Sequence, residues 1–177
     1  MSNTVRSRRH RRLKKAFFIF IGLYFMIGAT LYFFQEKILF SPTVLEREYV
    51  YQFLSPFEEV FLKTKGDANI NAIHFKAENP KGVILYFHGN GTSVDSWKFI
   101  AEAVLPKGAN LLMIDYRGYG KSTGVFSEQG FYQDAEAAYE YLKSISYNDS
   151  SIFFYVRSLG SVVAVEMALR HNVKGLI

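Results

Sequence analysis

The sequence contains no cysteine, which excludes disulfide bonds and thiolate metal sites from this chain. It also leaves the redox compartment undetermined. Apolar residues nevertheless make up 49% of the 177 residues and aromatic residues 17%. This content is enough for a hydrophobic core and excludes global disorder. The length suits one domain or part of a larger one.

Acidic residues are absent from positions 1–15, which hold seven of the 21 Lys and Arg residues. The rest of the chain therefore carries 14 basic and 16 acidic residues, so the net charge of +5 originates in this tail. Because the tail precedes a hydrophobic segment, its charge is interpreted as a membrane-topology signal, and no nucleic-acid partner is predicted. Contact of the tail with anionic lipid head groups is compatible with this interpretation.

Charge of either sign is absent from residues 16–34, AFFIFIGLYFMIGATLYFF. A helix of this length spans roughly 29 Å, close to the hydrocarbon thickness of a membrane. The basic excess on its N-terminal side predicts a single-pass helix in contact with lipid, with residues 1–15 in the cytoplasm and the remainder on the opposite side. The alternatives are a cleaved signal peptide and a buried core helix. The run is longer than a usual signal-peptide core, and no clear cleavage site follows it.

Only four prolines occur, and two of them, Pro42 and Pro56, fall in residues 35–57, which are predicted to be a connecting segment. After this segment, residues 58–64 and 70–76 alternate in polarity around a turn and predict an antiparallel hairpin. Continuous apolar runs at 82–88, 111–116 and 151–156 predict buried strands. Helical patterns cover 95–105, 127–144 and 161–171, with Ser127 as a cap, and 173–177 begins a further strand. This alternation predicts an α/β protein with a mostly parallel sheet.

Three glycine-containing loops follow three successive buried strands, so their residues are expected on one rim of the sheet. They are HGNG at 88–91, DYRGYGKSTG at 115–124 and RSLGS at 157–161. In the first, glycines let backbone N–H groups face a ligand; in the third, a serine stands at a strand-to-helix corner. Taken singly, the first also fits a tight turn and the third a plain helix cap. The second lacks the first glycine of a phosphate-binding loop, because position 115 is Asp.

Together and in this order, the three motifs resemble those of an α/β-hydrolase, over about Glu58 to Ile177. The resemblance is greatest to the membrane-anchored, monoacylglycerol-lipase-like and serine-aminopeptidase-like branch. It implies acyl transfer through a serine nucleophile, an ester, thioester or amide substrate on a small molecule or peptide, and neither a metal nor another cofactor. The residue roles it implies are Ser158 as nucleophile, backbone N–H groups of Leu159 and Asn90 as oxyanion hole, and His88, Gly89 and Gly91 as the supporting loop. Asp115 and Arg117 would be structural.

The acid and histidine of a catalytic triad are expected after the serine in this fold. The 19 residues after Ser158 contain only Glu166 and His171 as candidates. Along the predicted helix they lie about 12 Å and about 19 Å away, too far for a hydrogen bond. Residues 58–177 are therefore predicted to be an incomplete, C-terminally truncated hydrolase domain, inactive as this chain and with an exposed apolar strand edge. A non-catalytic membrane protein and one half of a split enzyme are the alternatives, and the oligomeric state is left open.

Overall fold

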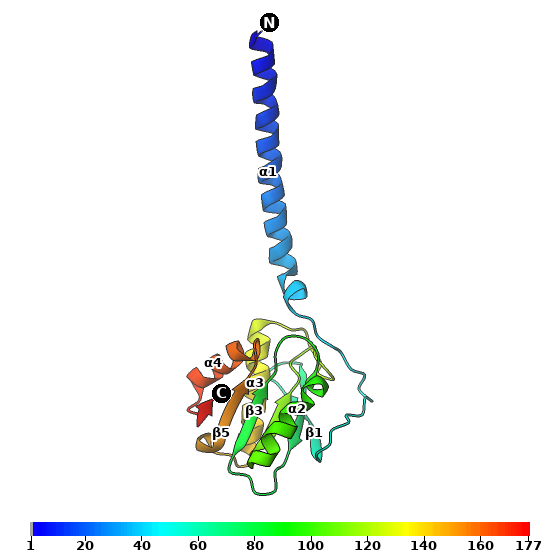
Figure 1. The fold of residues 1–177 in the computed structure, drawn as a ribbon, viewed down its shortest axis with the longest axis vertical. Coiled ribbons are helices and arrows are strands. Elements are labelled where there is room, and N and C mark those ends of the chain that lie inside the picture. Colours follow the sequence, from blue (N-terminus) through cyan, green and yellow to red (C-terminus); the bar gives the residue numbers. More distant parts are fainter. Residues whose placement is uncertain (1) are drawn as a thin grey trace. The chain divides into compact units, whose positions relative to one another are not determined.

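The computed structural model describes the backbone of residues 2–177 and the side chains of residues 11–177. The chain divides into two units, Met1–Leu39 and Phe40–Ile177 (Figure 1). The first is a single helix, α1 (Ser2–Leu39), which extends beyond the predicted 16–34 at both ends. The basic side chains of residues 1–10, including His10, lie outside the described part. Within Arg11–Leu39, the most apolar 18-residue window has a mean hydropathy of 2.1 and is entirely exposed, so this helix is long and apolar enough to span a membrane.

The second unit is built on a six-stranded sheet in the order β1-β2-β4-β3-β5-β6. The predicted hairpin is confirmed as β1 (Phe57–Lys63) and β2 (Asn69–Phe75), and β2 also runs antiparallel to β4 (Asn110–Ile114). From β4 onward the sheet is parallel, through β3 (Val83–Phe87), β5 (Ile152–Val156) and β6 (Gly175–Leu176). The predicted mixed α/β architecture is therefore correct.

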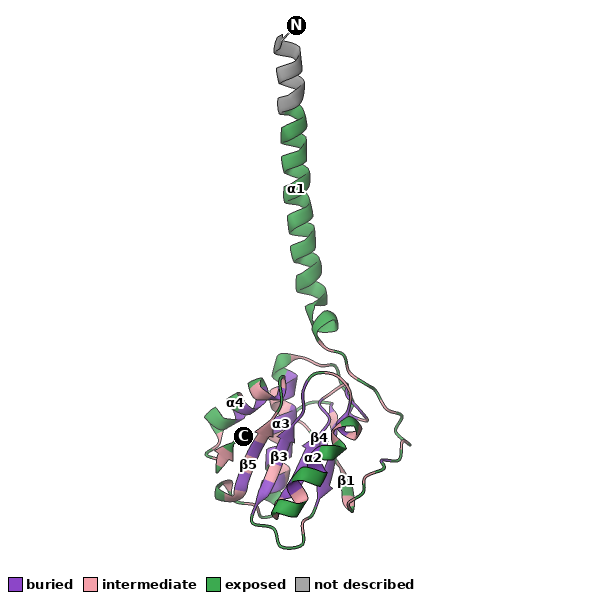
Figure 2. Cartoon of the chain, viewed as in Figure 1, coloured by how far each residue is buried: buried purple, intermediate pink, exposed green. Residues whose placement is uncertain are grey.

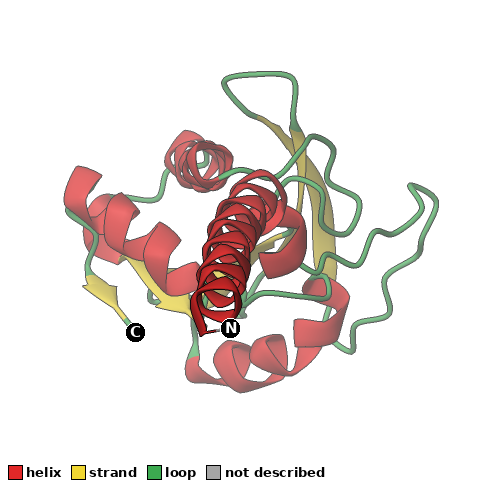
Figure 3. Ribbon diagram, turned by 90° about the horizontal axis from the view of Figure 1, so that it is seen from above, coloured by secondary structure: helices red, strands yellow, loops and turns green. Residues whose placement is uncertain are grey.

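Helices cover both faces of the sheet, as Figure 3 shows. On one face, α2 (Lys98–Val104) packs with residues of the 45–57 segment over the strands. On the other face, α3 (Glu128–Ser144) and α4 (Gly160–Arg170) cover a larger cluster. The central strands β3 and β4 are almost entirely buried (Figure 2), which explains their continuous apolar sequences.

Two local predictions have different outcomes. Ser127 is the N-cap of α3 as expected, and its hydroxyl oxygen accepts a 3.1 Å hydrogen bond from the Gly130 N–H. The helix expected over 95–105 is shorter, because a 3₁₀ turn occupies Val94–Trp97 and a second 3₁₀ turn follows at Leu105–Lys107. Pro106 in that second turn cannot donate an α-helical hydrogen bond.

Residues 40–56, within the predicted connecting segment, contact the sheet and the loops of the second unit. Tyr51 is buried, and its ring stacks on Phe53 with centroids 5.5 Å apart. The backbone of this segment also bridges to the site loops, since the Leu45 N–H donates to Gly120 O at 2.8 Å and the Thr43 N–H donates to Thr92 O at 3.2 Å. The segment therefore helps to hold the loops at the carboxyl ends of the strands.

The further strand expected at 173–177 is present as β6, which pairs with β5 and forms this edge of the sheet. Exposed apolar side chains lie on β6, at the adjoining Ile177 and on the outer face of α4. The exposed side chains there are Val162, Val165, Leu169, Leu176 and Ile177.

Candidate active site

The turn between β5 and α4 places Ser158 at an exposed corner with strained backbone. Its φ is +49°, in the left-handed region that costs a non-glycine residue roughly 1–2 kcal/mol. Ser158 is one of three non-glycine residues with positive φ in the described part of the chain, and Thr92, next to the HGNG loop, is another. Strain of this kind persists where the surrounding structure imposes it, and it is concentrated at functional sites.

Gly160 permits the corner to be this sharp. A Cβ atom at position 160 would lie 2.1 Å from the Phe87 carbonyl oxygen at the end of β3, so the first turn of α4 presses against that strand. The same carbonyl accepts a 3.1 Å hydrogen bond from the Arg157 N–H. A close approach of strand and helix also favours a small residue two positions before the serine. Val156 stands there, half-buried against the core that α4 covers, and its N–H donates to Ile177 O.

The HGNG loop lies directly beside this corner, as the motif order predicted. A Cβ atom on Gly89 would be 3.5 Å from the Ser158 Cβ and 3.5 Å from the Arg157 carbonyl oxygen. The Asn90 side chain organises the loop, since its Oδ1 accepts from the Gly91 N–H at 2.9 Å and from the Tyr119 hydroxyl at 3.0 Å. These contacts bring the first and third motifs together and connect them to the second.

The backbone N–H of Leu159 is available to a ligand at this corner. Among the described residues, no acceptor receives a hydrogen bond from it, and it directly precedes the first turn of α4. The next three N–H groups are already paired, since those of Gly160, Ser161 and Val162 donate to the carbonyl oxygens three residues earlier. An oxyanion at Ser158 would meet such a donor.

No imidazole of residues 11–177 hydrogen-bonds to the Ser158 hydroxyl. His171 Nε2 lies 3.0 Å from Glu136 Oε1, and the His171 ring stacks on Tyr139 with centroids 3.8 Å apart. The Nδ1 of His74 lies 3.3 Å from the Tyr141 hydroxyl. His88 is fully buried beneath the loop, where its Nδ1 donates to the Gly89 carbonyl oxygen at 2.7 Å. This hydrogen bond links the His88 ring to the backbone of the HGNG loop.

Asp115 is the second buried titratable group at this rim. Its Oδ1 accepts a 2.8 Å hydrogen bond from the Val94 N–H and lies 3.7 Å from His88 Nε2. Burial raises the pKa of Asp115 to about 7, with the Val94 and Tyr51 hydrogen bonds opposing the shift. Burial lowers the pKa of His88 to about 4, opposed by its bond to Gly89. The low pKa of His88 keeps its imidazole neutral near pH 7, so the two groups do not form an ion pair there.

These two pKa shifts predict opposing effects of pH on stability. The contribution of Asp115 is complete below its ordinary pKa of 3.8 and is lost as pH rises through about 7. The contribution of His88 is complete above its ordinary pKa of 6.5 and is lost as pH falls through about 4.

The substitution Asp115→Asn removes the contribution of Asp115 and leaves that of His88. Urea unfolding at about pH 4.5 and about pH 6.5 should then show stability rising more steeply with pH in the variant, by at most about 1.4 kcal/mol per pH unit. Equal slopes in the two proteins would contradict this assignment.

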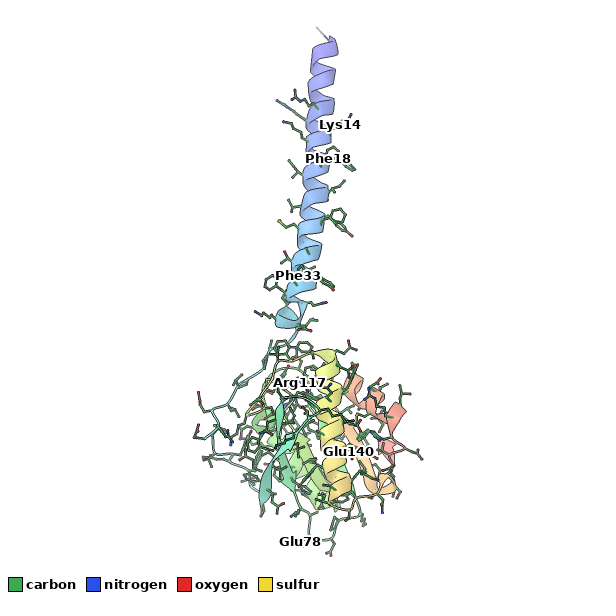
Figure 4. All side chains as sticks on the ribbon, turned by 180° about the vertical axis from the view of Figure 1, so that it is seen from behind. Lys14, Phe18, Phe33, Glu78, Arg117 and Glu140 are labelled. Atoms are coloured by element: carbon green, nitrogen blue, oxygen red, sulfur yellow. The ribbon has the colours of Figure 1, made fainter. Side chains whose placement is uncertain are left out.

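A groove of about 780 Å³ lies along α3, away from the site. Its lining includes Lys63, Gln133, Glu140 and His171 but not Ser158. Figure 4 shows Glu140 on this helix. Neither Ser158 nor the HGNG loop lines this groove.

The comparisons with known proteins agree with this geometry. Residues 78–177 match the family described as "Serine aminopeptidase, S33", which covers more than half of the chain. The chain belongs to the α/β-hydrolase family. The protein bem46 of Schizosaccharomyces pombe is 30% identical over 126 residues, which are 68% of this chain and 42% of that protein. The α/β-hydrolase domain-containing protein WAV2 of Arabidopsis thaliana is 30% identical over 159 residues, which are 83% of this chain and 51% of that protein.

Solved structures show the same fold. An α/β-hydrolase from Vibrio vulnificus is 27% identical with a TM-score of 0.59. The match covers 68% of the present chain and 42% of the Vibrio chain. A probable hydrolytic enzyme from Pseudomonas aeruginosa has a TM-score of 0.61 at 18% identity, covering 77% and 45% respectively. The chain thus spans about half, or less, of the length of these α/β-hydrolase relatives.

Proposed function

We propose that this protein is a membrane-anchored serine hydrolase that cleaves an ester, thioester or amide bond through an acyl-Ser158 intermediate. The observation that supports this most strongly is the strained corner itself. Ser158 is exposed and has a φ of +49°. Its corner is closely packed, because a Cβ on Gly160 would meet the Phe87 carbonyl oxygen and a Cβ on Gly89 would contact the Ser158 Cβ. A turn that only connects a strand to a helix does not require a strained backbone that exposes a hydroxyl, whereas a nucleophile must be exposed to its substrate.

In the proposed reaction, the Ser158 Oγ attacks the acyl carbon and the hydroxyl proton passes to a base. The N–H groups of Leu159 and Asn90 would stabilise the oxyanion that forms on the carbonyl oxygen. The bond from the acyl carbon to the leaving oxygen, sulfur or nitrogen then breaks, and the leaving group takes up a proton. Water attacks the acyl-serine, releases the acid and restores the hydroxyl.

We propose that the 177-residue chain by itself does not complete this reaction. Its described imidazoles are engaged by Gly89, Tyr141 and Glu136, so none is placed to accept the Ser158 proton. A serine hydroxyl without an adjacent base is a weak nucleophile. Catalysis would then be limited to what oxyanion donors and binding supply, roughly 10³–10⁴ over water.

Anchoring by α1 is part of the proposal. The span Arg11–Leu39 has the length and hydropathy of a membrane helix, and seven Lys and Arg residues stand in positions 1–15. This basic excess favours a cytoplasmic N-terminus and a hydrolase unit on the opposite side of the membrane.

Labelling by a fluorophosphonate probe tests the proposed nucleophile. The chain alone should label only at the level of its Ser158→Ala variant. The chain should label strongly when it is joined to the part of WAV2 that follows the matched region, and Ser158→Ala should abolish that signal. In-gel fluorescence of proteins labelled in neutral detergent measures the labelling of the chain alone and of the joined chain. Ser158-independent labelling of the joined chain would refute Ser158 as nucleophile, and its complete absence would favour a non-catalytic protein.

A further inference from the structure

Arg157 lies beside the proposed nucleophile and is exposed. Its Cζ is 5.0 Å from the centroid of the Trp97 ring, a cation–π contact that holds the guanidinium in place. Its Cγ lies 3.7 Å from where a Cβ on Gly89 would be, so the side chain passes next to the HGNG loop. The side chain of Arg157 thus passes the HGNG loop and ends over Trp97, in the 3₁₀ turn that follows this loop.

Within residues 11–177, Arg157 forms no ion pair with a carboxylate. Two other arginines of the second unit do, Arg117 with Asp134 and Arg170 with Glu166. An arginine fork matches a carboxylate or a phosphate with two parallel hydrogen bonds. Arg157 therefore presents an uncompensated positive charge at the rim where substrate would bind.

Two buried hydrogen-bond donors in this region have no acceptor among the described residues. They are the hydroxyl of Tyr86, a residue 1% exposed, and the Nε1–H of Trp97, whose rings lie 6.3 Å apart. Burial, and to a smaller extent the nearby Tyr155, raise the pKa of Tyr86 to about 12. The positive charge of Arg157 opposes this shift. The guanidinium is therefore within electrostatic reach of the Tyr86 hydroxyl. The corner thus has donors and positive charge, and no carboxylate of residues 11–177 forms an ion pair with Arg157.

We propose that Arg157, positioned by Trp97, is a specificity-determining residue that binds an anionic group, carboxylate or phosphate, of the acyl substrate close to the scissile bond. The inference rests on the proposed function and adds a substrate class to it. The substrate would be an acyl compound with a negative charge near the bond that Ser158 attacks. A purely structural arginine packed on Trp97 would instead be indifferent to ligand charge.

Trp97 provides a direct readout because it is the only tryptophan in the chain. The full chain in neutral detergent is titrated with hexanoate, hexyl phosphate and hexanamide while Trp97 fluorescence is recorded. At least one of the two anions should change the emission saturably, and hexanamide should not. The anion that binds more tightly distinguishes a carboxylate from a phosphate subsite. No saturable response to either anion, or an equal response to hexanamide, would overturn the proposal.

Matched variants separate charge from packing. Arg157→Gln should weaken anion binding at least tenfold, while Arg157→Lys should retain part of it. Arg47→Gln is the control, since Arg47 also lies over an aromatic ring, that of Phe61 at 6.0 Å, but in another part of the unit. Anion binding that is unchanged in Arg157→Gln, or reduced equally by Arg47→Gln, would contradict the assignment.

The Ser158→Ala variant distinguishes failure of this inference from failure of the hydrolase proposal. It should keep the anion response because Ser158 is not part of the charged subsite. Ser158-dependent labelling of the joined chain without an anion response would overturn the subsite and leave the nucleophile intact. An anion response without Ser158-dependent labelling would overturn the nucleophile instead.

Discussion

Arg117→Met is expected to lower the free energy of unfolding by about 3–5 kcal/mol, the range found when one partner of a buried ion pair is removed. The Asp134 carboxylate is fully buried and depends on Arg117 for its hydrogen bonds. Its Oδ1 accepts from Arg117 Nη2 at 2.8 Å and Nε at 3.0 Å, and its Oδ2 accepts from the Arg117 backbone N–H at 2.8 Å. Burial raises the pKa of Asp134 although Arg117 opposes the shift, so a carboxylate left without the guanidinium would be costly.

The surrounding structure makes room for this arginine. A Cβ on Gly130 would lie 2.5 Å from Arg117 Cδ, so only a glycine in the first turn of α3 leaves room for the arginine side chain. Urea unfolding of the full chain in neutral detergent measures the loss. Lys143→Met is the matched control, because it breaks the Lys143–Asp149 pair, which is much more exposed, and should have a far smaller effect. Equal losses in both variants would contradict the importance of burial.

Gly160→Ala is the second substitution with a large expected effect, a loss of about 3 kcal/mol in unfolding free energy from overpacking. The added methyl group would meet the Phe87 carbonyl oxygen at 2.1 Å and its carbon at 2.7 Å. These are backbone atoms of a buried strand and cannot rotate away. The helix must therefore move from the end of β3, which also disturbs the bond from the Arg157 N–H to Phe87 O and displaces Ser158.

Ser161→Ala tests whether the loss is specific to position 160. Position 161 is the next residue of α4, and alanine favours a helix interior. This control should unfold at nearly the same urea concentration as the unsubstituted chain. A Gly160→Ala protein with unchanged stability would show that strand and helix are not in the close contact described here.

The elements that could be predicted are those that local patterns determine. The β1–β2 hairpin follows from alternation, and the Ser127 cap follows from a hydroxyl placed before an amphipathic run. The juxtaposition of the HGNG loop and the Ser158 corner follows from a topological rule, since both loops come after parallel strands that pair with each other.

The features that the sequence did not reveal depend on contacts between distant residues. Tyr51 lies 64 positions from Asp115, yet its hydroxyl lies 3.4 Å from the Asp115 carboxylate and donates to Asn71 Oδ1 at 2.9 Å. No local pattern marks Tyr51 for this buried position, so residues 35–57 were interpreted as a connection. The Arg157–Trp97 contact was missed for the same reason, because the two residues belong to different loops.

Tandem mass spectrometry of the joined chain after fluorophosphonate treatment tests the central claim most directly. We predict a single phosphonylated peptide with the adduct on Ser158 Oγ, and no adduct on the 177-residue chain treated in the same way. An adduct on Ser161 or another hydroxyl, or equal modification of Ser158 in both chains, would contradict the claim that this corner holds a nucleophile that lacks its base.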